Sequence, residues 1–131
     1  MRVGMGTSLG ALAMLHAHCR YPDVFDAFFL QSGSFFWPRF DSHEQGFRYY
    51  RRIVRFVTDV HDGRLPLRPV PAVLTCGMIE ENIENNRLMV KTLRDGGYPS
   101  TLHEVPDMHN YTAWRDAFDP YLTELLRWVR R

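Results

Sequence analysis

Several features that would place this sequence outside the packed globular proteins are missing from it. It has two cysteines, Cys19 and Cys76, which lie far apart and outside any CxxC pattern. A disulfide framework is therefore not expected. Free thiols in a reducing compartment are expected instead. No apolar run approaches the ~20 residues that cross a bilayer, and the first residues lack the apolar core of a signal peptide. The sequence thus predicts a cytoplasmic protein with no membrane partner.

An excess of charge of either sign is also missing. The 131 residues carry a formal net charge of +1, so binding through neutralised phosphates is not expected, and no nucleic-acid partner is expected either. Nine Phe, six Tyr and three Trp are spread along the chain, which excludes disorder. This length suits a single domain over residues 1–131, and length alone leaves open whether that domain is whole.

Short apolar runs alternate along the chain with segments of helical periodicity. The runs typical of strands are residues 2–5, 27–31, 70–75 and 101–105. Helical spacing covers residues 8–20, 47–61, 82–95 and 112–129, with an interruption expected at Asp119-Pro120. This alternation predicts an α/β fold in three layers, a parallel sheet with helices on both faces.

The pattern GxSxG occurs at residues 6–10, between the first expected strand and the first expected helix. In this context the turn is so tight that a Cβ at Gly6 or Gly10 would clash, and it lifts the Ser8 hydroxyl above the sheet. The following helix points its N-terminus at the same place, where the Leu9 N–H would form one half of an oxyanion hole. Ser8 is therefore predicted to be a nucleophile, the alternative being a tight turn without chemistry.

Glycine motifs that would hold a cofactor do not fit the sequence. A dinucleotide-binding GxGxxG would need glycine at position 9, which is Leu9, and a phosphate-binding loop would need Gly-Lys-Ser/Thr, which does not occur. A serine nucleophile needs neither a metal nor an organic cofactor for its chemistry, and none is expected.

His109 is the candidate base for this serine. If the chain follows the order of serine, acid and histidine that goes with such a turn, the base falls late in the sequence. His109 comes directly after the last expected strand, at the sheet edge where Ser8 is also expected. The other histidines are expected to be structural or solvated: His16, His18, His43, His61 and His103. Residues two apart face different sides of a helix, so His16 and His18 are not expected to hold a metal.

The acid of a triad is expected in the loop after the strand that ends near Cys76. Glu80 and Glu81 lie in this loop, and one of them would accept the Nδ1–H of His109, fix its tautomer and stabilise the imidazolium. Glu80 is the first choice and Glu81 the second. Either could instead place negative charge at the N-terminus of the next helix, where it is favourable.

Four segments stand in an order that indicates a family. They are Gly6-Thr7-Ser8-Leu9-Gly10-Ala11, Gln31-Ser32-Gly33-Ser34-Phe35-Phe36-Trp37, Gly77-x-x-Glu80 with Asn85 and Asn86, and His109-Asn110-Tyr111-x-x-Trp114-Arg115. Together they resemble the esterase family of α/β-hydrolases that contains enterochelin esterase. The resemblance implies the α/β-hydrolase fold, with Ser8 as nucleophile, His109 as base and Glu80 as acid. Members cleave esters, including siderophore trilactones, feruloyl esters and S-formylglutathione, and some are mycolyl transferases.

The sequence departs from this family at its N-terminus. In the family the strand before the serine lies near the middle of a larger sheet, whereas this sequence starts inside that strand. The resemblance therefore implies the C-terminal portion of an α/β-hydrolase domain, truncated at the N-terminus and without the upstream loop that donates the second oxyanion N–H. Removing one such donor lowers the rate by about 10²–10³. The open sheet edge would favour self-association with another chain.

The sequence predicts a serine esterase that hydrolyses a small-molecule ester through an acyl-enzyme. Acyl transfer to another alcohol would use the same residues. The alternative is a non-catalytic fragment, or an assembly partner that completes a sheet with another chain. In the loop over residues 33–46, Phe35, Phe36, Trp37 and Arg39 would suit a pocket for an aryl or catecholate ester. Equally, the aromatic residues could pack this loop onto the sheet.

Overall fold

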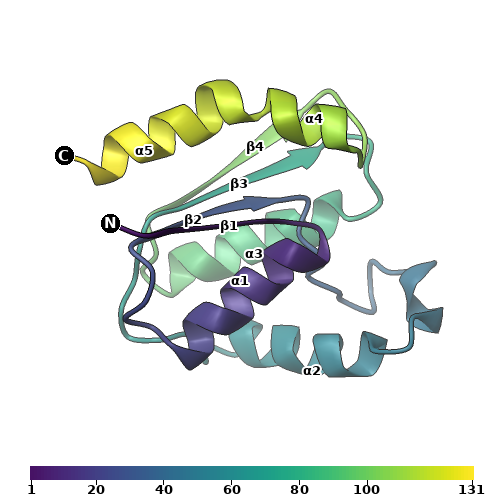
Figure 1. Cartoon of the computed structure of the whole chain (residues 1–131). Helices are drawn as coiled ribbons and strands as arrows, with labels where there is room; N and C mark the ends of the chain where they lie inside the picture. The colour runs from purple at the N-terminus through teal and green to yellow at the C-terminus, as the bar shows by residue number, and fades with distance from the viewer.

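Strands and helices alternate from end to end in the computed structural model, which describes residues 1–131 (Figure 1). The strands are β1 (Val3–Thr7), β2 (Ala27–Gln31), β3 (Ala72–Gly77) and β4 (Ser100–Val105). The helices are α1 (Leu9–Arg20), α2 (Tyr50–His61), α3 (Ile83–Asp95), α4 (Tyr111–Asp116) and α5 (Thr123–Val129), with two short helical segments, η1 (Glu44–Gly46) and η2 (Phe118–Leu122). Each expected strand and helix is present, and the expected interruption falls in η2, where Asp119 leaves helical geometry.

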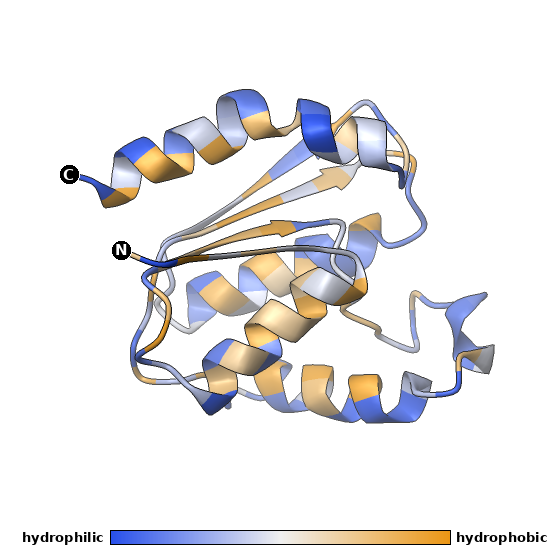
Figure 2. Cartoon of the chain, viewed as in Figure 1, coloured by the Kyte–Doolittle hydropathy of each residue, from blue (hydrophilic) through white to orange (hydrophobic).

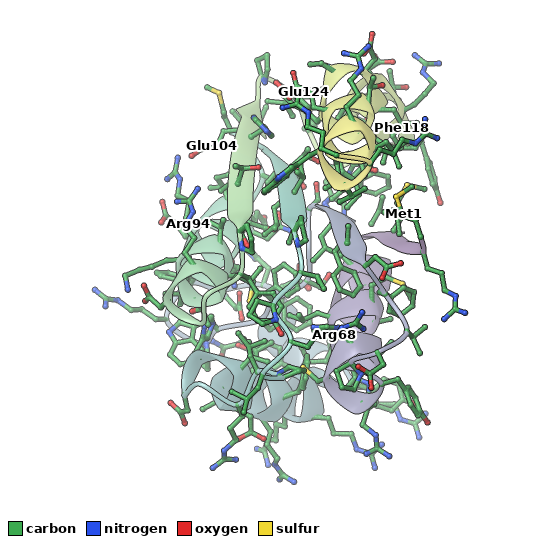
Figure 3. All side chains as sticks on the ribbon, turned by 90° about the vertical axis from the view of Figure 1, so that its left-hand side faces the viewer. Met1, Arg68, Arg94, Glu104, Phe118 and Glu124 are labelled. Carbon is green, nitrogen blue, oxygen red and sulfur yellow. The ribbon has the colours of Figure 1, made fainter.

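The four strands form one parallel sheet in the order β1-β2-β3-β4. Thr7 pairs with Gln31 and Gln31 with Thr75, and β4 continues the same alignment, so the carboxyl ends of the strands meet at one edge. β2 and β3 are buried along their whole length, which explains why their sequences are continuously apolar. Figure 3 shows the strands side by side, with Met1 next to β1 at one border and Glu104 on β4 at the other.

Helices cover both faces of the sheet (Figure 1). α1, α2 and α3 lie on one face, and α4, η2 and α5 lie on the other. A cluster of 15 buried residues fills the space under the first group, and a smaller cluster of Ala27, Phe29, Val73 and Leu125 lies under α5. Figure 2 shows the apolar side of α2 turned toward α1 and α3 and its hydrophilic side turned outward. The predicted three-layer α/β architecture with a parallel sheet is confirmed.

Two helices differ from their expected outlines. α1 begins at Leu9, one residue after the expected start; Leu12 and Leu15 are buried, whereas Leu9 is 44% exposed because the first turn of α1 lies at the end of the sheet. α2 begins at Tyr50, so Phe47 belongs to the preceding loop, where it is 39% exposed. None of the helices combines the length and the hydropathy that a membrane crossing requires.

Two of the histidines that the sequence marks as structural are packed inside the molecule. His18 is fully buried, and its Nε2 lies 2.9 Å from the Tyr98 hydroxyl. That hydroxyl donates its proton to the Pro66 carbonyl (3.0 Å), so His18 donates from Nε2 and its Nδ1 has no partner. His61 is similar, because its Nδ1 lies 2.6 Å from Thr92 Oγ1 and its Nε2 has no partner. Burial lowers the pKa of both histidines, since a second proton would create a buried charge with an unpaired N–H.

Acidification from about pH 7.5 to about pH 5.5 is expected to lower the free energy of unfolding. In the unfolded chain a histidine has a pKa of 6.5, whereas the pKa values of His18 and His61 are lowered in the fold, so the unfolded state takes up protons first. The stabilisation that comes from burying both histidines in their neutral form is fully present above the histidine pKa of the unfolded chain. It is lost as the pH falls through the lower pKa values that the two histidines have in the folded chain. Urea unfolding at a series of pH values measures it, and His18→Gln or His61→Gln should flatten the decline. A free energy of unfolding that rises on acidification would contradict it.

Candidate active site

Ser8 occupies the turn between β1 and α1 and has a backbone conformation that few residues other than glycine adopt. Its φ is 55° and its ψ is −122°, a region that costs about 1–3 kcal/mol. Two backbone hydrogen bonds hold the turn: the Ser8 N–H donates to the Gln31 carbonyl (2.8 Å), and the Ser8 carbonyl accepts the Ser34 N–H (3.2 Å). The neighbouring strand β2 and the loop after it therefore fix the strained turn, which presents Ser8 at the carboxyl edge of the sheet.

The two glycines of the GxSxG pattern have different roles. A Cβ on Gly6 would lie 2.3 Å from the Gly10 carbonyl oxygen and 2.7 Å from the Ala11 nitrogen, so this position requires glycine. A Cβ on Gly10 would meet nothing within 4 Å. The prediction that both positions would clash is thus right for Gly6 and wrong for Gly10, because Gly10 lies on the exposed side of the first turn of α1.

His109 lies in the loop between β4 and α4, at the same edge of the sheet as Ser8. Its Nε2 is 3.1 Å from Ser8 Oγ, and its Nδ1 is 2.5 Å from Glu80 Oε1. α4 begins directly after this loop, where Asn110 Oδ1 accepts the Ala113 N–H (2.9 Å) and caps the helix. The cap fixes the path by which the chain leaves His109, and with it the position of the ring.

Glu80, and not Glu81, reaches the histidine. Glu80 is buried, whereas the side chain of Glu81 is 68% exposed and lies 3.8 Å from His43. One carboxylate oxygen of Glu80 faces His109, and the other accepts the Gly77 N–H at 2.5 Å. Only the backbone carbonyl of Glu80 accepts an amide of α3, that of Ile83 at 3.3 Å, and its carboxylate makes no hydrogen bond to the helix, so the alternative of a capping side chain does not describe it. Of the two candidate acids, the structure brings the first choice to the base.

Gly77 allows the loop of the acid and the loop of the histidine to meet. A Cβ at this position would lie 2.1 Å from the Asp107 carbonyl oxygen and 2.8 Å from Glu80 Oε2. A side chain here would push the two loops apart and separate Glu80 from His109. The sequence marks Gly77 as part of the Gly77-x-x-Glu80 segment but gives no steric reason for it, because nothing local shows that the loop after β4 approaches this position.

A cavity of about 360 Å³ opens in front of Ser8. Its lining combines the apolar residues Leu9, Phe36 and Phe47 with the polar residues Ser8, Ser34, Glu44, Glu80, Glu81, Asn82 and His109. Ser34 Oγ lies 3.2 Å from Ser8 Oγ. Leu9 is the first residue of α1, where a backbone N–H has no partner within the helix, so its amide is free to face an oxyanion beside Ser8.

The loop over residues 33–46 contributes less to this cavity than its aromatic residues suggest. Phe36 lines it, whereas Phe35 is fully buried in the larger apolar cluster and Trp37 packs against that cluster. Arg39 is exposed and does not belong to the lining. Packing of the loop therefore accounts for Phe35 and Trp37, and the cation that would suit a catecholate is not in the cavity.

Asn85 and Asn86, in the first turns of α3, hold this loop in place. Asn86 accepts the Gly33 N–H and donates to the Gly33 carbonyl, both at 3.1 Å. Asn85 Nδ2 donates to the Phe35 carbonyl (3.1 Å) and to Asp41 Oδ1 (2.9 Å). These buried side chains supply the hydrogen bonds that the loop backbone does not obtain from the sheet.

The remaining histidines do not form a metal site. His16 is exposed and His18 is buried, so they lie on different sides of α1 as the spacing predicts. His103, on β4, stacks on Tyr121 with ring centroids 4.1 Å apart. The structure contains no group of three or more His, Cys, Asp or Glu side chains that could hold a metal ion.

Ser8, His109 and Glu80 provide a continuous path for a proton. For Ser8 Oγ–H to donate to His109 Nε2, the neutral imidazole must carry its own proton on Nδ1 and donate it to Glu80 Oε1. The observed distances fit this tautomer. The arrangement can therefore remove a proton from a hydroxyl at the edge of the cavity while a buried carboxylate stabilises the imidazolium that results.

Solved structures that share this arrangement of elements are α/β-hydrolase esterases. Enterochelin esterase of Shigella flexneri has a TM-score of 0.76 at 24% identity, over 98% of this chain and 31% of that one. A ferulic acid esterase has a TM-score of 0.72 at 20% identity, over 95% of this chain and 50% of that one. S-formylglutathione hydrolase of Staphylococcus aureus has a TM-score of 0.63 at 14% identity, over 98% and 51%. No protein-family model matches the sequence, and no curated protein sequence matches it.

The residues of this chain therefore form part of the α/β-hydrolase fold. Almost the whole chain is covered in each comparison, whereas it spans between 31% and 51% of the lengths of these structures. The α/β-hydrolase fold that the four ordered segments imply by their resemblance is confirmed.

Proposed function

We propose that this chain carries the triad of a serine esterase. The observation that supports this most directly is the pair of contacts made by His109, with Ser8 Oγ at 3.1 Å and with Glu80 Oε1 at 2.5 Å. Ser8 makes its contact from a strand-to-helix turn with positive φ, the context in which a serine nucleophile is exposed above a sheet. The names of the structural neighbours, enterochelin esterase and ferulic acid esterase, support ester cleavage as the reaction.

In the first step Ser8 Oγ attacks the carbonyl carbon of the ester while His109 Nε2 takes the hydroxyl proton. Glu80 holds the Nδ1 proton of His109 and stabilises the positive charge on the ring. The carbonyl oxygen becomes an oxyanion, to which the Leu9 N–H donates. The bond to the alcohol oxygen then breaks, the alcohol leaves with the proton from His109, and the acyl group stays on Ser8.

Water completes the reaction in the second step. His109 Nε2 takes a proton from the water molecule while the water oxygen attacks the acyl carbon. A second oxyanion forms beside the Leu9 amide and collapses, and Ser8 Oγ leaves with the proton from His109. The products are an alcohol and a carboxylic acid, and Ser8, His109 and Glu80 return to their starting protonation states.

The lining of the cavity favours a neutral ester over an anionic one. Phe36 and Phe47 offer apolar surface to the substrate, Glu44 and Glu81 add negative charge, and no Lys or Arg belongs to the lining. An anionic substrate would be repelled by these carboxylates without a compensating cation. We therefore propose a small, neutral carboxylic ester as the substrate class.

A fluorophosphonate probe is expected to label wild-type protein once per chain, with the modification mapped to Ser8 by peptide mass spectrometry. The reason is that the probe reacts only with a serine whose proton a neighbouring base removes. Ser8→Ala should take up no label. Ser34→Ala is the matched control, because Ser34 Oγ lies in the same cavity 3.2 Å from Ser8 Oγ, and it should still be labelled.

Two results would contradict this proposal. Labelling that survives Ser8→Ala would remove this serine from the mechanism. A chain that is folded by circular dichroism and takes up no label would instead favour the alternative of a non-catalytic assembly partner.

A further inference from the structure

A chain of two hydrogen bonds ends at Oε2 of Glu80, the carboxylate oxygen that does not face His109. The indole Nε1–H of Trp114 donates to Ser32 Oγ at 3.0 Å, and Ser32 Oγ–H donates to Glu80 Oε2 at 2.8 Å. Ser32 lies directly after β2 and is 1% exposed, and Trp114 lies on α4. Neither residue belongs to the lining of the cavity in front of Ser8.

The direction of this chain follows from the chemistry of its members. An indole N–H can only donate, so Ser32 Oγ must accept from Trp114 and has its single proton left for Glu80. A carboxylate that accepts such bonds is held in one rotamer. Since Ser32 Oγ–H donates to Oε2 together with the Gly77 N–H (2.8 and 2.5 Å), the other oxygen of Glu80 is directed at His109 Nδ1.

Trp114 also contacts the histidine. Its ring lies edge-on to that of His109, with centroids 4.8 Å apart and planes at 85°. Its backbone carbonyl accepts a hydrogen bond from Gln31 Nε2 at 2.8 Å, which ties this part of α4 to the end of β2. One side chain thus contacts the base directly and the acid through Ser32.

The backbone of Ser32 gives an independent indication that its hydroxyl matters. Its φ is 49°, in the left-handed region where glycine is favoured over any residue with a Cβ. A glycine would relieve this conformation but would leave Trp114 Nε1 and Glu80 Oε2 without the hydroxyl that joins them. The position thus holds a serine where glycine would suit the backbone better, and the hydroxyl is the part of its side chain that makes the two hydrogen bonds.

We infer that Ser32 and Trp114 are positioning residues that hold the side chains of Glu80 and His109 at hydrogen-bonding distance from each other, an inference that rests on the proposed esterase function. Because both residues lie outside the cavity, their loss should lower kcat and the rate of labelling and leave KM within about twofold. Ser32→Ala removes a hydrogen bond to a charged group and should lower kcat by about 10- to 100-fold, whereas Trp114→Phe removes a hydrogen bond between neutral groups and should lower kcat by about 2- to 10-fold. Trp114→Phe keeps an aromatic ring edge near His109 and removes only the indole donor.

The experiment compares these variants with matched substitutions elsewhere in the full chain. Ser100→Ala removes another buried hydroxyl, which donates to the Tyr98 carbonyl at 3.0 Å. Trp37→Phe removes another indole that lies edge-on to a histidine, His61, with centroids 4.9 Å apart. Both controls should keep wild-type kcat and labelling rate. Ser32→Gly should lose as much activity as Ser32→Ala even where it unfolds at a higher urea concentration, since it relieves the backbone and still lacks the hydroxyl.

A second measurement does not depend on turnover. The His109 Nδ1–H that donates to Glu80 should give a proton magnetic resonance far downfield of the amide and indole signals, assigned by its loss in His109→Gln. The resonance should persist in both controls and broaden or vanish in Ser32→Ala and Trp114→Phe, because the freed carboxylate no longer holds the proton. If the resonance and the labelling rate are unchanged in these variants, the positioning role is wrong. If wild-type protein is not labelled, the esterase proposal fails, and the resonance alone decides on the positioning role.

Discussion

Replacing Ser8 or His109 by alanine is expected to lower kcat for a neutral ester such as p-nitrophenyl acetate by about 10⁴- to 10⁶-fold. The reason is the contact between Ser8 Oγ and His109 Nε2, through which, in the proposed mechanism, the serine hydroxyl loses its proton as it attacks. Because the two groups act in one step, the double variant should be no slower than the slower single variant. Steady-state hydrolysis by the three variants and the wild type measures both effects.

Glu80 supplies a graded test of the same triad. Glu80→Gln keeps the size of the side chain but loses the charge that stabilises the imidazolium, so kcat should fall by about 10⁴-fold. Glu81→Gln is the matched control, since Glu81 is the next residue along the chain and does not contact His109.

The Ser8→Ala, His109→Ala double variant gives the contradicting outcome for the first prediction. If its loss of kcat equals the product of the two single losses, the two residues act independently, and the triad mechanism would not hold.

The positions of Ser8 and His109 at one edge follow from the sequence because each comes directly after a strand. β1 precedes Ser8 and β4 precedes the loop of His109, and the carboxyl ends of parallel strands lie at the same edge of a sheet. The strands themselves were predictable because burial on both faces leaves β2 and β3 with continuous apolar sequences. Periodicity and chain order, with the GxSxG pattern that marks Ser8, were therefore enough to predict the three-layer α/β fold and the approach of these two residues.

The choice between Glu80 and Glu81 depends on a turn that periodicity does not describe. The Glu80 N–H donates to the Gly77 carbonyl at 3.1 Å, and this turn directs Glu80 inward and leaves Glu81 exposed. This turn also requires glycine at position 77, because the Asp107 carbonyl occupies the place where a Cβ would lie. These contacts join segments distant in sequence, and the same is true of the hydrogen bonds from Trp114 through Ser32. Local sequence patterns do not reveal either set of contacts.

The GxSxG pattern shows a different limit, because a motif groups residues that the structure separates. Only Gly6 is enclosed by backbone atoms, while Gly10 faces open space in the first turn of α1. The prediction of a steric clash, which is right for Gly6, was therefore wrongly extended to Gly10.

Gly6→Ala and Gly10→Ala are accordingly expected to have opposite effects on stability, although they make the same substitution on either side of Ser8. The added methyl group at Gly6 would lie 2.3 Å from the Gly10 carbonyl oxygen, and a backbone atom of a helix cannot move aside as a flexible side chain can. The free energy of unfolding should fall by about 3 kcal/mol. At Gly10 alanine replaces the residue with a low helix propensity in open space, and the free energy of unfolding should rise by up to about 1 kcal/mol. Urea unfolding followed by circular dichroism measures both changes.

The two variants also separate the geometry of the turn from the presence of the serine. Any displacement of α1 that accommodates alanine at position 6 moves the Leu9 amide and Ser8 together, because Ser8 has the strained φ of 55° that links strand to helix. Gly6→Ala should therefore lose fluorophosphonate labelling with Ser8 still in place, whereas Gly10→Ala should be labelled at close to the wild-type rate. Equal labelling of both variants would show that the approach of α1 to β1 does not control the nucleophile. Equal loss of stability would show that Gly10 is constrained by a contact that residues 1–131 do not make in this structure.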